Sequence, residues 1–265
     1  MGSVPIKRGN EIMILSAITR QSHMDKSWNR FSSYRFADRE CFVPVTAAEV
    51  PDAALSLPLA FVRQKDHFIL AAVLSLIPGI NLFVSPDGQW LGKYVPSEFR
   101  GYPFRLAMGG PENELMLCVD EDSVLVHADR AVGEPFFDHD GELSGPVKEV
   151  LAFLTHQERS RSVTRERVAD LAGAGLIQEW PLKVRINDRE KTVLGLHRID
   201  ETKLNSLKTE PFLKVRSALP IAYAQMLSMG HVMGLEKMAQ QRRQMKDKIP
   251  DIHAAFGDDD MISFE

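Results

Sequence analysis

One short stretch of the sequence places enough acidic side chains together to suggest metal binding. Residues 136–146, Phe-Phe-Asp-His-Asp-Gly-Glu-Leu-Ser-Gly-Pro, contain two aspartates, a histidine and a glutamate within five positions. If Gly141 is the sixth residue of a calcium loop, Asp138 and Asp140 occupy the third and fifth positions, but apolar residues occupy the first and twelfth. Since the two ligands that carry most of the charge are missing, the spacing favours an Asp-Gly turn over a cation loop.

A second acidic group follows the apolar run at 115–119, at the expected end of a strand. Its carboxylates and those of the turn can form an oxygen-rich site for a divalent ion such as magnesium, with one carboxylate activating water. Five residues carry this hypothesis of a metal-assisted enzyme: Asp120, Glu121, Asp122, Asp138 and Asp140. Sequence distance does not determine whether they converge, and a solvated strand end is the favoured alternative.

Other catalytic motifs are absent from the sequence. His127, His139 and His156 lack the spacing of the H-E-x-x-H zinc motif, and there is no nucleophile elbow, phosphate-binding loop or dinucleotide fingerprint. We therefore expect no cofactor, and the sequence favours a protein that is not an enzyme.

The segment most like a recognition surface interleaves aromatic residues with arginines between 90 and 105. Such residues can stack on a ligand or bind a carboxylate. The candidate ligand-binding residues are Trp90, Tyr94, Arg100, Tyr102, Phe104 and Arg105. The alternative, which we favour because aromatic residues in strand-rich folds are mostly buried, is that they close one end of the core.

Charge argues against nucleic acid as the main partner. The chain has 32 basic and 36 acidic side chains and a net charge of −4, so it lacks a basic footprint over the whole domain. Residues 164–175 resemble the first helix of a helix-turn-helix superficially, but the following residues, 176–181, look extended rather than like a recognition helix. Nucleic-acid binding stays a second alternative.

The sequence predicts a cytoplasmic location. Cys41 and Cys118 have apolar neighbours, as buried thiols in a reducing compartment do. The apolar run at 12–18 is short for a secretory signal. The long apolar segment 218–235 contains Gln225 and other polar or helix-breaking residues, so it indicates a buried or interfacial helix rather than a membrane span.

Short apolar runs separated by turn residues predict strands between 59 and 126. The predicted strands are 59–63, 68–74, 81–84, 89–91 and 115–119. Before them, Thr46 and Glu49 form a capping box that predicts a helix over 47–50.

Helical periodicity begins after residue 144. Ser144-Gly-Pro146 predicts a helix start, and Thr164 predicts the cap of a separate helix that ends near Gly173 or Gly175. A hairpin is expected around 187–190, a short helix over 200–207, and a long helix or broken pair from Pro211 to about 247 with a kink near Pro220. Met226, Met229 and Met233 form a stripe in it that we interpret as core.

These elements predict an α+β fold, with an antiparallel, sheet-rich N-terminal half packed with a helical C-terminal half. We expect an N-terminal arm over 1–40, one domain over 41–247 and an acidic tail over 248–265. The domain can also consist of two docked lobes, 41–143 and 144–247.

Several segments resemble, in order, the SapC family of bacterial proteins, which is named for a surface-array, or S-layer, locus. The resemblance covers about residues 40 to 240. It is carried by IPGINLFVSPDGQWLGKYVPSEFRGYPFRLA (77–107), LCVDEDS (117–123), GEPFFDHDGELSGPVKEVLAFL (133–154), GLHRIDETKLNSL (195–207) and IAYAQMLSMGHVMGL (221–235).

The resemblance implies an association with surface-layer protein production or peptide transport, and it brings no catalytic residues. We therefore expect a non-enzymatic cytoplasmic accessory protein that binds a peptide or protein of a cell-surface or uptake system. The oligomeric state and the identity of the partner are left open by the sequence.

Overall fold

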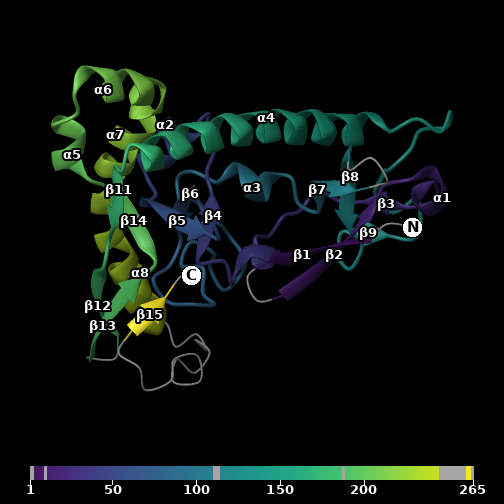
Figure 1. Ribbon diagram of the computed structural model, residues 1–265. Helices are drawn as coiled ribbons and strands as arrows, with labels where there is room; N and C mark the ends of the chain where they lie inside the picture. The colour runs from purple at the N-terminus through teal and green to yellow at the C-terminus, as the bar shows by residue number, and fades with distance from the viewer. Residues whose placement is uncertain (1–2, 9–10, 110–113, 187–188, 245–260, 264–265) are drawn as a thin grey trace. The chain divides into compact units, whose positions relative to one another are not determined.

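The structure of the chain is a computed structural model (Figure 1). It describes residues 3–8, 11–109, 114–186, 189–244 and 261–263. The chain divides into two compact units, each made of two separate stretches of sequence. Unit 1 consists of Met1–Ser32 and Glu98–Arg159, and unit 2 of Ser33–Ser97 and Ser160–Glu265. Antiparallel sheets in the N-terminal half and helices in the C-terminal half confirm the predicted α+β class.

Unit 1 contains a four-stranded antiparallel sheet of order β1-β2-β8-β7 and a small sheet of order β10-β3-β9. The strands of the larger sheet are β1 (Ser3–Arg8), β2 (Glu11–Ala17), β7 (Phe104–Gly109) and β8 (Glu114–Asp120). Those of the smaller sheet are β3 (Ser27–Trp28), β9 (Val126–His127) and β10 (Glu134–Pro135). The short helices are α1 (Arg20–His23) and α3 (Ser97–Arg100), whose first residue belongs to unit 2.

Strands β1 and β2 lie in the stretch that the sequence predicts to be an arm. Strand β2 pairs with β8, with Leu15 opposite Asp120, and Leu15 is fully buried. This stretch therefore contributes to the sheet of unit 1. Strand β7 was not predicted either, because its aromatic and arginine residues suggested a binding segment.

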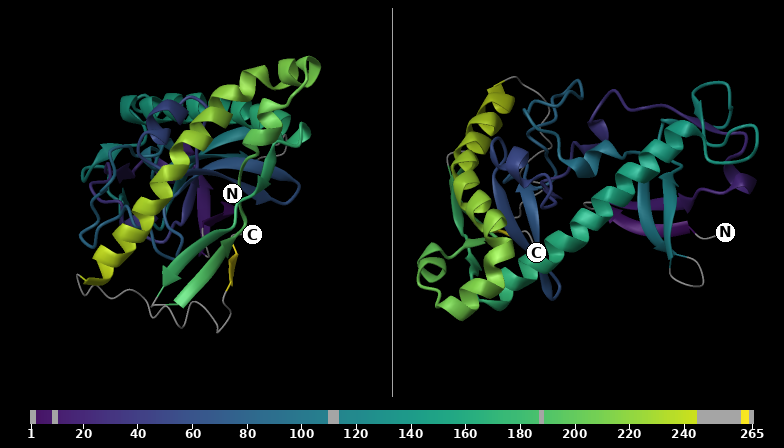
Figure 2. Two further views of the ribbon diagram at one scale, coloured as in Figure 1. Left: turned by 90° about the vertical axis from the view of Figure 1, so that its left-hand side faces the viewer. Right: turned by 90° about the horizontal axis from the view of Figure 1, so that it is seen from above.

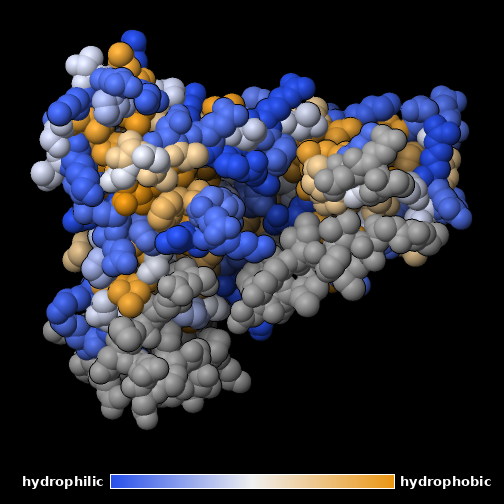
Figure 3. All heavy atoms as spheres, in the orientation of Figure 1, coloured by the Kyte–Doolittle hydropathy of each residue, from blue (hydrophilic) through white to orange (hydrophobic). Residues whose placement is uncertain are grey.

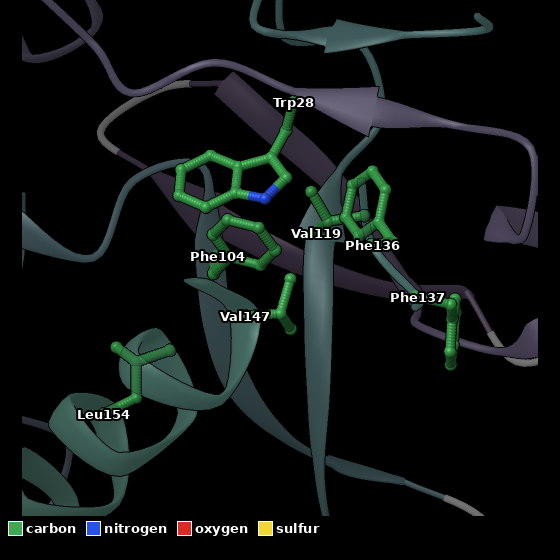
Figure 4. Close-up of a cluster of buried hydrophobic side chains, with 7 residues drawn as sticks. All are labelled: Trp28, Phe104, Val119, Phe136, Phe137, Val147 and Leu154. Atoms are coloured by element: carbon green, nitrogen blue, oxygen red, sulfur yellow. The ribbon is translucent and has the colours of Figure 1, made fainter. Parts of the chain in front are cut away.

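Aromatic side chains form the core of unit 1 (Figure 4). The indole of Trp28 meets the ring of Phe104 edge to face, with the ring centroids 4.6 Å apart, and Phe104 lies 5.8 Å from Phe136. The buried cluster consists of Trp28, Phe104, Val119, Phe136, Phe137, Val147 and Leu154. The cluster joins strands, the acidic Asp-Gly turn around Gly141 and the first turns of helix α4 (Gly145–Gly173). It therefore fixes the position of the Asp-Gly turn.

Unit 2 contains a five-stranded antiparallel sheet of order β11-β14-β5-β6-β4. Its strands are β4 (Phe42–Pro44), β5 (Leu59–Gln64), β6 (His67–Val73), β11 (Ile177–Glu179) and β14 (Leu196–Ile199). A second sheet joins β12 (Leu182–Ile186), β13 (Arg189–Leu194) and β15 (Met261–Ser263).

Several strand predictions are confirmed and others are corrected. Strands β5 and β6 form the predicted hairpin, and β12 and β13 the later one, whose turn residues 187 and 188 lie outside the described residues. The runs at 81–84 and 89–91 form no strands and share only one bridge, between Val84 and Trp90. They are too short to extend pairing beyond the tight turn at Gly88. Of the predicted acidic tail, only β15 is described.

Helix α4 (Gly145–Gly173) begins where Ser144-Gly-Pro146 predicts. The predicted cap at Thr164 is wrong, because the sequence between 147 and 172 contains no glycine or proline and the helix continues through it. Gly175 has φ +66°, and the Leu176 amide donates to the Leu171 carbonyl, as in a Schellman C-cap. Residues of α4 up to Arg159 belong to unit 1 and the later ones to unit 2.

Unit 2 also contains two short helical elements before residue 55 and a series of consecutive helices from residue 201 (Figure 2). They are η1 (Arg35–Ala37), α2 (Val50–Ala54), α5 (Glu201–Asn205), α6 (Thr209–Val215), η2 (Arg216–Ala218), α7 (Leu219–Ser228), η3 (Met229–His231) and α8 (Val232–Gln244). The predicted break near Pro220 is confirmed by the 3₁₀ turn η2, while the second 3₁₀ turn, η3, was not predicted.

Candidate functional site

The acidic turn of unit 1 is held by its own backbone. Asp138 Oδ1 accepts hydrogen bonds from the amides of Asp140 at 3.0 Å and Glu142 at 2.9 Å. Gly141 has φ +77°, a left-handed conformation that glycine adopts without strain. The Asp-Gly turn predicted from the sequence is therefore confirmed.

The three side chains of the second acidic group, Asp120, Glu121 and Asp122, lie in different surroundings. The Tyr102 hydroxyl donates to Asp120 Oδ2 at 3.3 Å, Glu121 Oε2 lies 2.6 Å from Lys26 Nζ, and Asp122 is exposed. Within the described part of the chain, no three side chains of His, Cys, Asp and Glu are placed to hold one metal ion. This arrangement gives the hypothesis of a metal-assisted enzyme no support.

A buried histidine lies next to this acidic group. His23 has no exposed surface, its Nε2 lies 2.8 Å from Glu121 Oε1, and its Nδ1 accepts a hydrogen bond from the Thr19 amide. Its ring packs on Phe136 at 5.1 Å. Burial lowers the pKa of His23, because its effect outweighs the opposing attraction of the neighbouring Glu121 carboxylate.

The six candidate ligand-binding residues fall into different units. Trp90 and Tyr94 belong to unit 2, and the other four belong to unit 1. Phe104 is 1% exposed and is a core residue, as the alternative interpretation predicts. Arg105 is half-buried, and its guanidinium lies 2.6 Å from Glu98 Oε1, while Glu98 Oε2 also accepts from Gln157. Arg100 is exposed at the end of α3.

Glu49 is a polar centre of unit 2 that sequence reasoning assigned only to a capping box. The helix α2 begins at Val50 rather than at 47, and the Glu49 side chain is 6% exposed. Its Oε1 accepts from the Thr46 amide at 2.8 Å, the Thr46 hydroxyl at 3.1 Å and the Ser97 hydroxyl at 2.7 Å. Its Oε2 accepts from the Tyr94 hydroxyl at 2.7 Å and the Ser97 amide at 2.8 Å.

The Glu49 network also positions the candidate Trp90. The Trp90 indole N–H donates to the Tyr94 carbonyl at 2.9 Å, and its ring stacks on Phe83 with the centroids 5.5 Å apart. Trp90 and Tyr34 are partly exposed and lie 5.6 Å apart. The side-chain polar groups of Trp90 and Tyr94 thus have partners within unit 2.

The helices α7, η3 and α8 present a buried face to the sheet of unit 2. Gln225 Oε1 accepts from the Ile199 amide of β14, and its Nε2 donates to the Leu59 carbonyl of β5. Ser228 Oγ accepts from the Leu59 amide. The buried residues of this face are Ile221, Ala222, Gln225, Ser228, Val232 and Leu235.

The opposite side of the same helices is also apolar, and it is exposed. Leu227 is 81% exposed, Met233 66% and Tyr223 47%. Helical spacing places Gly230 and Gly234 on this side as well, and a Cβ added to either glycine would meet nothing within 4 Å. We call Tyr223, Leu227, Gly230, Met233 and Gly234 the outer face.

The methionine stripe predicted to be core is therefore only partly buried. Met226 and Met229 are half-buried, but Met233 points outward. The 3₁₀ turn η3 has fewer residues per turn than an α-helix, so it rotates Met233 away from the other two.

None of the helices in the described ranges combines the length and apolar character that a membrane crossing requires.

Comparison with protein families gives a match to a family model described as SapC, over residues 18–235. The match begins earlier than the resemblance near residue 40 predicts, so it includes β3 and part of the N-terminal stretch. No curated protein and no solved structure matches the chain.

Proposed function

The chain belongs to the SapC family, and on that premise we propose that it is a cytoplasmic accessory protein that binds a polypeptide of a surface-layer or peptide-uptake system. The family name supports the association with such a system. The physical support comes from the outer face of α7, η3 and α8.

The observation that carries the proposal is a helix pair that is apolar on two opposite sides. A helix that packs on one sheet normally has one apolar side, with polar residues facing water. Here the second side exposes Leu227 and Met233, which are among the most exposed large apolar side chains of the described residues. Burying such a side chain contributes about 1.5–3 kcal/mol, so a partner gains from covering them.

The shape of the outer face favours an amphipathic helix as the bound element. Gly230 and Gly234 have open space where side chains would lie, and Leu227 and Met233 flank them. The open space over the two glycines can accept the apolar side of a partner helix, whose apolar contact residues recur every three or four positions. The same proposal gives the aromatic residues around Trp90 a secondary role at most, because their polar groups have partners inside unit 2.

Affinity capture from the source bacterium tests the proposal. The full chain is compared with the double variant Leu227→Lys and Met233→Lys, and with Val124→Lys, which changes a 90% exposed valine of unit 1. We expect the wild type and the Val124 variant to retain one specific surface-layer or uptake polypeptide that the double variant loses. Arg100→Ala with Tyr102→Ala tests the aromatic and arginine segment in the same way. Equal retention by the double variant contradicts the proposal.

A further inference from the structure

Helix α6 is almost entirely exposed, although it carries two large apolar side chains. Only Val215, at 1% exposure, is buried among its seven residues. Leu213 is 58% exposed and Phe212 39%. A helix this short draws little stability from its own hydrogen bonds and normally depends on a packed apolar side. The exposed apolar pair therefore requires an explanation outside the core of unit 2.

Cationic side chains surround this apolar pair in the sequence. From residue 203 to residue 216 there are four cations, Lys203, Lys208, Lys214 and Arg216, and one acid, Glu210. Lys214 Nζ lies 3.1 Å from Glu210, and Lys203 Nζ lies 3.5 Å from Asp200, the N-cap of α5. Residues 203–216 thus carry four cations against one acid, a balance of +3, which becomes +1 when the adjacent Asp200 and Glu201 are included, on a chain whose net charge is −4. Figure 3 shows hydrophobic and hydrophilic residues intermixed over the part of unit 2 that α5 and α6 form.

The size of this surface distinguishes between possible occupants. A stable protein interface buries about 800 Å² on each partner, which two side chains on one short helix do not provide. A lipid surface requires less, since a few apolar side chains enter the interfacial region while nearby lysines and arginines attract anionic headgroups. Phe212 and Leu213 among four cations meet both requirements.

We propose that α6 and its flanking residues, 203–216, form a docking tip for an anionic membrane surface. Phe212 and Leu213 enter the boundary between headgroups and acyl chains, and the surrounding cations contact the headgroups. This association is peripheral and reversible, because it uses only two apolar side chains. It is independent of the outer face, which lies on later helices and is proposed for a polypeptide.

Vesicle sedimentation with the full chain tests this proposal. We expect the protein to sediment at least about tenfold better with phosphatidylcholine vesicles that contain phosphatidylglycerol than with phosphatidylcholine alone. Salt screens the attraction, so raising it from about 0.05 M to about 0.5 M should weaken the binding. The double variant Phe212→Ser and Leu213→Ser should bind the anionic vesicles about tenfold more weakly, because it removes the apolar groups that enter the lipid.

The matched control is Leu91→Ser, which changes a 59% exposed leucine of unit 2 outside the tip and should bind like the wild type. Because Phe212, Leu213 and Leu91 are all exposed, both variants should keep the thermal unfolding midpoint of the wild type. Absence of sedimentation with anionic vesicles at low salt, or equal sedimentation of the Phe212 and Leu213 variant, overturns the proposal. A dimer in ultracentrifugation that this variant dissociates also overturns it, by showing that a second copy covers the tip.

Discussion

Glu49 of unit 2 has no other acid within two positions of it in the sequence, whereas Asp138 and Asp140 of unit 1 belong to a turn with three acidic residues in five positions. Glu49 is 6% exposed and accepts five hydrogen bonds from three other residues, two of them more than 40 positions away. Among the described residues, Asp138 accepts only from amides of its own turn, and Asp140 is exposed. Local density of acids therefore indicates a solvated turn, while convergence of distant donors identifies the carboxylate on which the fold depends.

The largest effect is expected from Glu49→Ala. The substitution leaves the buried amides of Thr46 and Ser97 without an acceptor, and each such group costs about 1–3 kcal/mol. We expect the free energy of unfolding in urea to fall by about 3 kcal/mol. Asp122→Ala, at an exposed position of the acidic group, is the control and should change it by less than about 0.5 kcal/mol. Similar losses for the two variants would contradict the claim that the fold depends on Glu49 more than on the exposed acids.

A smaller effect is expected from Asp138→Ala, which removes the acceptor for two amides of the turn. Because the turn is partly exposed, water can replace the carboxylate, and the loss should be about 1 kcal/mol in the same urea experiment. Asp140→Ala removes no hydrogen bond of this kind and should lie within about 0.5 kcal/mol of the wild type. If Asp140→Ala destabilised the protein as much as Asp138→Ala, the account of the turn would be wrong.

The pH dependence of stability tests the buried contact between His23 and Glu121. Burial lowers the pKa of His23 in the folded protein, so the folded state binds fewer protons than the unfolded state near the ordinary histidine pKa of about 6.5. The stabilisation by neutral His23 is complete above that pKa and is lost as the pH falls through the folded-state pKa.

The measurement is the free energy of unfolding at about pH 7.5 and about pH 5.5 for the wild type and for His23→Gln, which cannot take up a proton. The wild type should lose more stability than the variant over this interval. Equal losses would show that protonation of His23 does not contribute to the pH dependence of stability.

Local sequence signals predicted the parts of the fold that depend on neighbouring residues. Gly141, Ser144 and Gly175 each mark a turn or a helix end whose geometry is decided within a few positions. Thr164 shows the limit of this approach. It is a good capping residue, but no helix-breaking residue precedes it, so its hydroxyl instead accepts from the Ala47 amide inside unit 2.

The candidate site depends on tertiary structure that no local pattern encodes. The capping box correctly brings the Glu49 carboxylate to the Thr46 amide, but nothing near it in sequence indicates Tyr94 or Ser97. The outer face has the same origin. Periodicity predicts an apolar helix near Leu227, but which side is covered depends on the sheet against which the helix packs and on the rotation at η3.

The most direct test of the proposed function is the affinity of the captured polypeptide for the wild-type chain and for Leu227→Lys, measured by calorimetry together with urea unfolding. Because Leu227 is 81% exposed, the substitution should leave the free energy of unfolding within about 0.5 kcal/mol of the wild type. Placing a charge against the apolar side of a bound helix should weaken the affinity, raising the Kd at least about tenfold. Unchanged affinity in a variant of unchanged stability would contradict the assignment of the outer face as the binding surface.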